Sequence, residues 1–193
     1  MASEKIIRSR SLAREAAVRA LYQINMATVK VDKAIEDVIH LDTYAPDAIS
    51  FINELVRGVK SKQNELDKKL KPLLAKGWDF SRISKIDREV LRLACYELFY
   101  IDNIPPKVSI NEAVKIALKY GSSENSKFVN GLLGKLFEKS PKKDWDPSKF
   151  EKVEPEVEEE VTEPDNEIEV VEEGSDTYNE LKKAGKWTLK TDS

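Results

Sequence analysis

The chain has 193 residues and a formal net charge of −3, which hides an uneven distribution of charge. Residues 1–140 carry 24 Lys and Arg against 18 Asp and Glu, whereas residues 141–193 carry 8 against 17. One cysteine, Cys95, excludes an intrachain disulfide, and together with the one histidine, His40, it excludes a zinc site of the usual Cys/His type. Without a signal-peptide pattern or an apolar run of about 20 residues, we expect no membrane segment and a cytoplasmic location.

The first half of the body is predicted to contain three helices. Residues 10–28 have apolar residues at three- and four-residue spacing, and many of these are alanines that let another helix approach closely. Residues 32–40 form a short second helix. The third helix is expected to start near Pro46 and to be stopped or kinked by Pro72. Its apolar seam follows a heptad pattern: Ile49, Ile52, Val56, Val59, Leu66 and Leu70, interrupted by Gln63.

The second half contains the most apolar helix, which follows a short segment at 73–76 and a loop around Trp78. Ser84 and Asp87 have capping-box spacing at its start, and Pro105 and Pro106 are expected to end it. A second capping box, Ser109 with Glu112, is expected to open the next helix, which ends at Gly121. Residues 124–139 form the last core helix.

These segments predict an all-α body of about seven helices in two packed subdomains, residues 1–77 and 78–140. Residues 141–150 are interpreted as a linker. Residues 151–173 contain eleven Glu and one Asp against one Lys. Such a segment cannot bury enough apolar surface to offset its ordering entropy, so we expect residues 141–193 to form a disordered acidic tail.

The residues do not predict catalysis. His40 stands alone beside an apolar stripe, and Cys95 falls in the most apolar helix, where a thiol stays protonated. Gly131 and Gly134 lack the spacing of a phosphate-binding loop and the strand that should precede it. We therefore expect a protein that is not an enzyme and that needs no cofactor or metal.

Basic residues at the start of the chain suggest RNA binding instead. Arg10 and Arg14 lie one helical turn apart, Arg8 precedes the first turn, and Tyr22 offers an aromatic plane further along. Guanidinium groups with stacking aromatic side chains are typical of single-stranded RNA binding. Taken alone, the same spacing also fits an ordinary solvated helix face, and this alternative stays open.

Four stretches resemble the NusB family of bacterial transcription antitermination proteins. They are "RxRxxxREAAVRALYQ", "DREVLRLACYEL", "IPPKVSINEAVKIALKYG" and "SKFVNGLLGK", and the similarity runs from about Arg8 to Glu138. The resemblance implies an all-α fold of two helical halves. It also implies binding to the boxA element of nascent ribosomal RNA together with NusE, the ribosomal protein uS10, within an RNA polymerase complex that includes NusA and NusG.

The resemblance also assigns site residues. It implies RNA contacts at Arg8, Arg10, Arg14, Tyr22, Lys127 and Phe128, with Glu124 at the same edge. Contacts with NusE are predicted on the central helix, around Glu89 and Tyr96. The tail after Pro141 lies outside the family pattern.

Two other functions and one assembly stay open at this point. The chain could be a helical adaptor that binds only proteins, or an RNA-binding module like the one that some RNA cytosine methyltransferases carry. A homodimer is also left open.

Overall fold

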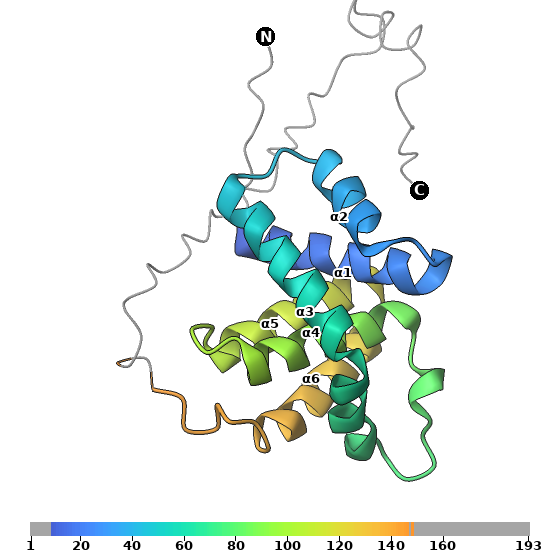
Figure 1. Cartoon of the computed structure of the whole chain (residues 1–193). Helices are drawn as coiled ribbons and strands as arrows, with labels where there is room; N and C mark the ends of the chain where they lie inside the picture. Colours follow the sequence, from blue (N-terminus) through green and yellow to red (C-terminus); the bar gives the residue numbers. More distant parts are fainter. Residues whose placement is uncertain (1–8, 147, 149–193) are drawn as a thin grey trace, which may run out of the picture. The chain divides into compact units, whose positions relative to one another are not determined.

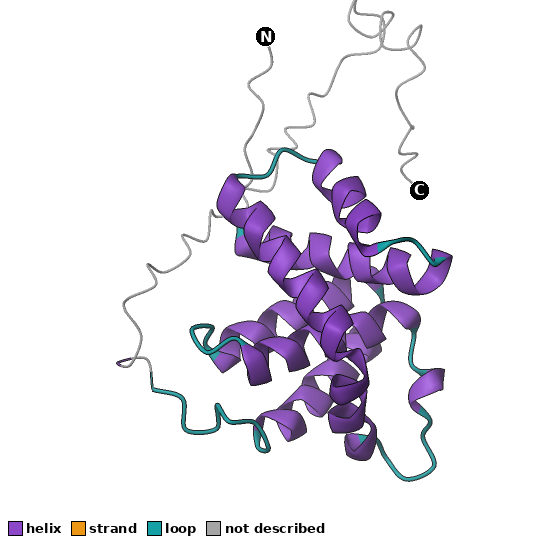
Figure 2. Ribbon diagram, in the orientation of Figure 1, coloured by secondary structure: helices purple, strands orange, loops and turns teal. Residues whose placement is uncertain are grey.

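Six α-helices make up the part of the chain that the structure describes, residues 9–146 and 148 of a computed structural model (Figures 1 and 2). They are α1 (Arg10–Ala27), α2 (Val31–His40), α3 (Pro46–Leu70), α4 (Lys85–Tyr100), α5 (Pro106–Tyr120) and α6 (Ser123–Phe137), with short 3₁₀ turns at Lys71–Leu73 and Phe80–Arg82. These residues include no β-strand. The predicted all-α class is confirmed, with six α-helices in place of about seven.

The helices share one continuous apolar core, and α4 lies at its centre. Helix α4 packs against α1, α3, α5 and α6, while α3 crosses α1 and α5 pairs with α6 (Figure 1). The heptad seam of α3 supplies Ile52, Val56, Val59, Leu66 and Leu70 to this core. The division into subdomains at residues 77 and 78 stays a prediction.

Local sequence signals explain most helix ends. The Ser84 hydroxyl accepts a hydrogen bond from the Asp87 N–H at 3.1 Å, so the predicted cap of α4 is confirmed. Gly121 follows the last residue of α5, also as predicted. The predicted cap at Ser109 and Glu112 is wrong, because α5 already begins at Pro106, where the fixed φ of proline suits a first helical turn.

Residues 140–145 pack on the loop between α4 and α5. The buried ammonium of Lys142 donates hydrogen bonds to the backbone carbonyls of Ile101 and, at 2.6 Å, of Ile104. The Trp145 indole N–H donates to the Asp102 carbonyl at 3.0 Å. The predicted linker is therefore wrong for residues 141–145, and we call residues 140–145 the C-terminal strap.

The rest of the expected acidic tail, from residue 149 on, lies outside the described residues, as does Arg8. None of the helices in the described part combines the length and the apolar character needed to cross a membrane.

Candidate nucleic-acid interface

Arg14 lies in the core instead of on the RNA-facing stripe that the sequence predicted. Its guanidinium is 1% exposed, and its Nε donates to the Glu97 carboxylate on α4 at 2.8 Å. The alanines around it (Ala13, Ala16, Ala17 and Ala20) are fully buried, which lets α1 lie close to its neighbours. The prediction of Arg14 as an RNA contact is thus wrong, because the side chain is committed to a buried ion pair.

Arg10 occupies the start of the same helix but is only half-buried. Its guanidinium lies over the ring of Phe51 on α3, 4.6 Å from the ring centroid. Ser9 caps the helix by accepting a hydrogen bond from the Leu12 N–H. Arg10 remains partly exposed despite this cation–π contact, so it stays a candidate for phosphate contact.

The outer edge of α1 is tied to the end of α5. Lys119 Nζ donates to both carboxylate oxygens of Glu15 at 2.8 Å, and the Tyr120 hydroxyl donates to Glu15 at 2.6 Å. Burial alone would raise the pKa of Glu15, but these hydrogen bonds and the charge of Lys119 lower it overall. This edge of α1 serves to hold the two helices together.

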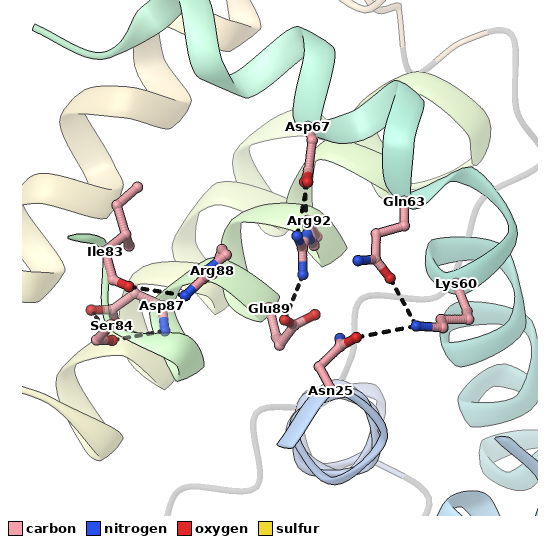
Figure 3. Close-up of polar contacts among 10 residues, drawn as sticks. All are labelled: Asn25, Lys60, Gln63, Asp67, Ile83, Ser84, Asp87, Arg88, Glu89 and Arg92. Atoms are coloured by element: carbon pink, nitrogen blue, oxygen red, sulfur yellow. Dashed lines mark hydrogen bonds and ion pairs between the residues drawn. The ribbon is translucent and has the colours of Figure 1, made fainter. Parts of the chain in front are cut away.

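A cavity of about 180 Å³ opens between α1, α3 and α4. We call it the polar pocket, and its lining residues are Tyr22, Asn25, Met26, Gln63, Lys85, Arg88, Glu89 and Arg92. Figure 3 shows Asn25, Gln63, Arg88, Glu89 and Arg92 of this lining, with Asn25 on α1 facing residues of α3 and α4. Tyr22 is partly exposed at this cavity, about 18 Å along the helix axis from Arg10 given the rise per residue of an α-helix.

Arg92 organises the floor of the polar pocket. It donates two hydrogen bonds to Asp67 on α3, at 2.8 and 2.9 Å, and a third to Glu89 at 2.7 Å (Figure 3). Burial raises the pKa of Glu89, against the opposing charge of Arg92. Glu89 thus lines the polar pocket as a buried group that is already paired.

Tyr96, the other residue expected to contact NusE, does not line the polar pocket. Its ring stacks on Tyr100 at a centroid distance of 5.3 Å and covers Gly58 of α3. A Cβ at position 58 would lie 2.1 Å from the Tyr96 ring, so any other residue there would displace this ring. The structure therefore does not bring the two proposed contact residues into one site.

The first turn of α4 joins the polar pocket to α6. Lys85 and Arg88 line the pocket, while the carboxylate of Asp87 accepts hydrogen bonds from Ser84 and from the side-chain amide of Asn125 on α6. Because Asp87 is buried, this junction fixes where α6 begins relative to α4.

Three predicted residues lie on the first turns of α6. Glu124 and Lys127 are exposed, and hydrogen bonds from Ser122, its own backbone and Ser123 lower the pKa of Glu124. Phe128 is half-buried, and its ring stacks on Trp78 with centroids 6.0 Å apart and an interplanar angle of 25°. Trp78 was not among the predicted contacts, although an aromatic residue directly after a glycine in a polar loop is a signal for an exposed ring.

These groups suit binding better than covalent chemistry. Burial raises the pKa of the Cys95 thiol to about 12, which keeps it protonated. His40 is exposed, and its Nδ1 lies 2.7 Å from the Glu36 carbonyl of its own helix. The surface groups that remain are cations and aromatic rings, namely Arg10, Tyr22, Lys85, Arg88, Lys127, Phe128 and Trp78.

Comparison with known proteins gives a consistent result. The model of the NusB family matches residues 11–138. The chain is 41% identical over 136 residues to the transcription antitermination protein NusB of Halalkalibacterium halodurans, covering 70% of this chain and 98% of that protein. Such relatives are named as antitermination proteins, which agrees with the expectation of a protein that is not an enzyme.

Solved structures show the same fold. NusB of T. maritima superimposes with a TM-score of 0.65 at 34% identity, covering 70% of this chain and 95% of the other. A NusB chain crystallised with NusE and double-stranded RNA gives a TM-score of 0.63 at 24% identity, covering 69% and 98%. On the family match and the identity along nearly the whole length of its relatives, the chain belongs to the NusB family.

Proposed function

We propose that the chain is a transcription antitermination factor that binds boxA RNA of nascent ribosomal RNA transcripts together with NusE. The observation that carries the proposal is the match to antitermination proteins over nearly their full length. The complex of a NusB with NusE and RNA supports both partners. NusA, NusG, RNA polymerase and a cytoplasmic place of action follow as further parts of the same proposal.

The RNA contacts that we propose are Arg10, Tyr22, Lys127 and Phe128, with Glu124 at the same edge and Arg8 as part of the N-terminal arm. Arg10, Tyr22 and the α6 residues are all at least partly accessible. Arg14 leaves this set because its guanidinium faces Glu97. Affinity comes mainly from phosphate neutralisation, and sequence preference comes from stacked bases.

For NusE we propose docking at the rim of the polar pocket. Lys85 and Arg88 supply charge there and Tyr22 and Met26 supply apolar surface. Glu89 acts through Arg92, whose side chain it positions by accepting a hydrogen bond. Tyr96 contributes to the packing of α4 on α3, where its ring covers Gly58.

A fluorescence titration with boxA RNA, with and without NusE, tests the proposal. We expect binding that NusE strengthens, with a slope of log K against log salt of roughly −3 if about four phosphates are engaged. A scrambled RNA of equal length is the control. If the chain binds NusE but no RNA, it is an adaptor that binds only proteins. Light scattering on the same samples measures the molar mass and so tests for a homodimer.

A further inference from the structure

Trp78 lies on the surface in a loop whose backbone forms hydrogen-bonded turns. The backbone N–H of Trp78 donates to the Ala75 carbonyl at 2.9 Å and closes a turn in which Gly77 has φ +85°, a conformation that favours glycine. Directly after it, Asp79 accepts a hydrogen bond from the Ser81 N–H at 2.9 Å. Two hydrogen-bonded turns therefore shape the backbone from which the indole projects.

Most of this indole remains in water. Trp78 is 58% exposed, and its contact with Phe128 leaves the rest of the ring system open. Exposing so much apolar surface is unfavourable by roughly 25 cal/mol for each Å². An exposed pair of stacked aromatic rings is therefore a feature that a binding partner would cover.

Helix α6 has two residues without a side chain, Gly131 and Gly134, in the turns that follow Phe128. Gly131 lies one turn after Phe128, and a Cβ added at Gly131 or Gly134 would meet no atom within 4 Å. Packing inside the described part of the chain therefore does not require either glycine, although glycine weakens a helix relative to alanine. At Gly131 the absence of a side chain lets a ligand approach the helix beside Phe128.

The charges around the aromatic pair favour a polyanion. Residues 71–82 carry the exposed cations Lys71, Lys76 and Arg82 against one carboxylate, Asp79, which is hydrogen-bonded to Ser81. On α6 the exposed Lys127 directly precedes Phe128, and one exposed carboxylate, Glu124, lies one turn before Phe128. An apolar protein segment would use the rings but would gain nothing from these cations, whereas a nucleotide chain uses both.

We propose that Trp78 and Phe128 form a stacking platform for an unpaired RNA base, with Lys127 and Lys76 binding the adjacent phosphates. The inference rests on the proposed RNA-binding function and extends it to a residue and a loop that the sequence did not select. Gly131 lets the nucleotide lie against α6, and Trp78 supplies most of the stacking surface.

The test is a titration of boxA RNA with the full chain, its NusE partner present, over a series of salt concentrations. Trp78→Ala should weaken binding roughly tenfold, within the range found for loss of one base–aromatic stack, while the salt slope stays unchanged. Trp78→Phe should restore most of the affinity. Leu41→Ala, at another exposed apolar residue, is the matched control and should bind as the wild type does.

A second arm reads the stacking directly. In a Trp145→Phe, Trp187→Phe background Trp78 is the one tryptophan, and boxA RNA should quench its fluorescence. In a series of boxA RNAs that each lack one base, quenching of the Trp78 fluorescence should be reduced for only one position of the missing base. Gly131→Ala should weaken binding several-fold, and Gly134→Ala should leave it unchanged.

The outcomes separate the two claims. If Trp78→Ala binds RNA as the wild type does, the platform is refuted and the proposed function stands. If it loses NusE binding while RNA binding persists, the rings belong to a protein interface and the inference is overturned. If the wild type binds no RNA with NusE present, both claims fall.

Discussion

The start of α1 and the outer face of α6 were both predicted to bind RNA, yet the fold uses their charges differently. On α1, Arg14 is buried against Glu97 and Arg10 lies over Phe51. On α6, Lys127 is exposed beside an aromatic pair. A cation with a buried partner contributes to folding, whereas an exposed one beside stacked rings remains free to bind phosphate. A cation on a helix that the sequence predicts to bind RNA can therefore serve either purpose.

The largest effect that would test this contrast is on stability. Arg14→Ala leaves Glu97 buried without this partner and should lower the free energy of unfolding by about 3–5 kcal/mol. Urea unfolding followed by circular dichroism measures the loss. The RNA salt slope of the folded protein should not change.

The matched control replaces both charges. Arg14→Met with Glu97→Leu should recover much of the stability, because neither member of the pair is then buried alone. If Arg14→Ala is as stable as the wild type and reduces the salt slope of RNA binding, Arg14 is an RNA contact and the proposed difference between α1 and α6 is wrong.

A smaller effect is expected on α6, and it concerns binding alone. Lys127→Ala should reduce the magnitude of the RNA salt slope by about 0.7, the value for one single-strand phosphate contact. Its unfolding free energy should stay within about 0.5 kcal/mol of the wild type, because the side chain is exposed. The control is Lys33→Ala, at an exposed lysine on α2, which should change neither the salt slope nor the unfolding free energy. If Lys127→Ala leaves the salt slope unchanged, Lys127 is not an RNA contact.

The smallest effect is a pH dependence at the edge of α1. The pKa of Glu15 is lowered below its ordinary 4.5 in the folded state, so its stabilisation is present above that value and is lost as the pH falls through the folded pKa. Glu15→Gln should therefore flatten the acid side of the stability curve. Thermal unfolding between about pH 3 and pH 6 measures this, and superimposable curves would show that Glu15 does not couple α1 to α5.

Helix positions were predictable because local chemistry determines them. The spacing of apolar residues placed α1, α2 and α3 within a residue or two of their observed ends. Ser84 was recognised as a cap because its hydroxyl satisfies a backbone N–H three residues on. The family resemblance then supplied the function, which no helix pattern contains.

The parts that failed depend on groups far away in the sequence. Nothing near Arg14 shows that Glu97 will lie opposite it, so its spacing looked like that of a surface residue. The C-terminal strap looked like a linker because its polar residues are typical of one, yet Lys142 finds carbonyl partners at Ile101 and Ile104. The stacking of Trp78 on Phe128 was not predictable because a loop residue meets a ring that comes from α6, 50 positions later in the chain.

The buried pair of Arg14 and Glu97 has a consequence for the order of folding. Its two residues are separated by 83 positions, so forming it requires closure of a loop that contains α2, α3 and most of α4. Contacts of such high sequence separation form late unless other contacts have already brought the helices together. During synthesis at about 5–20 residues per second, Arg14 precedes Glu97 by roughly ten seconds. The Arg14 guanidinium on α1 therefore stays hydrated until α4 has been synthesised and packs against α1.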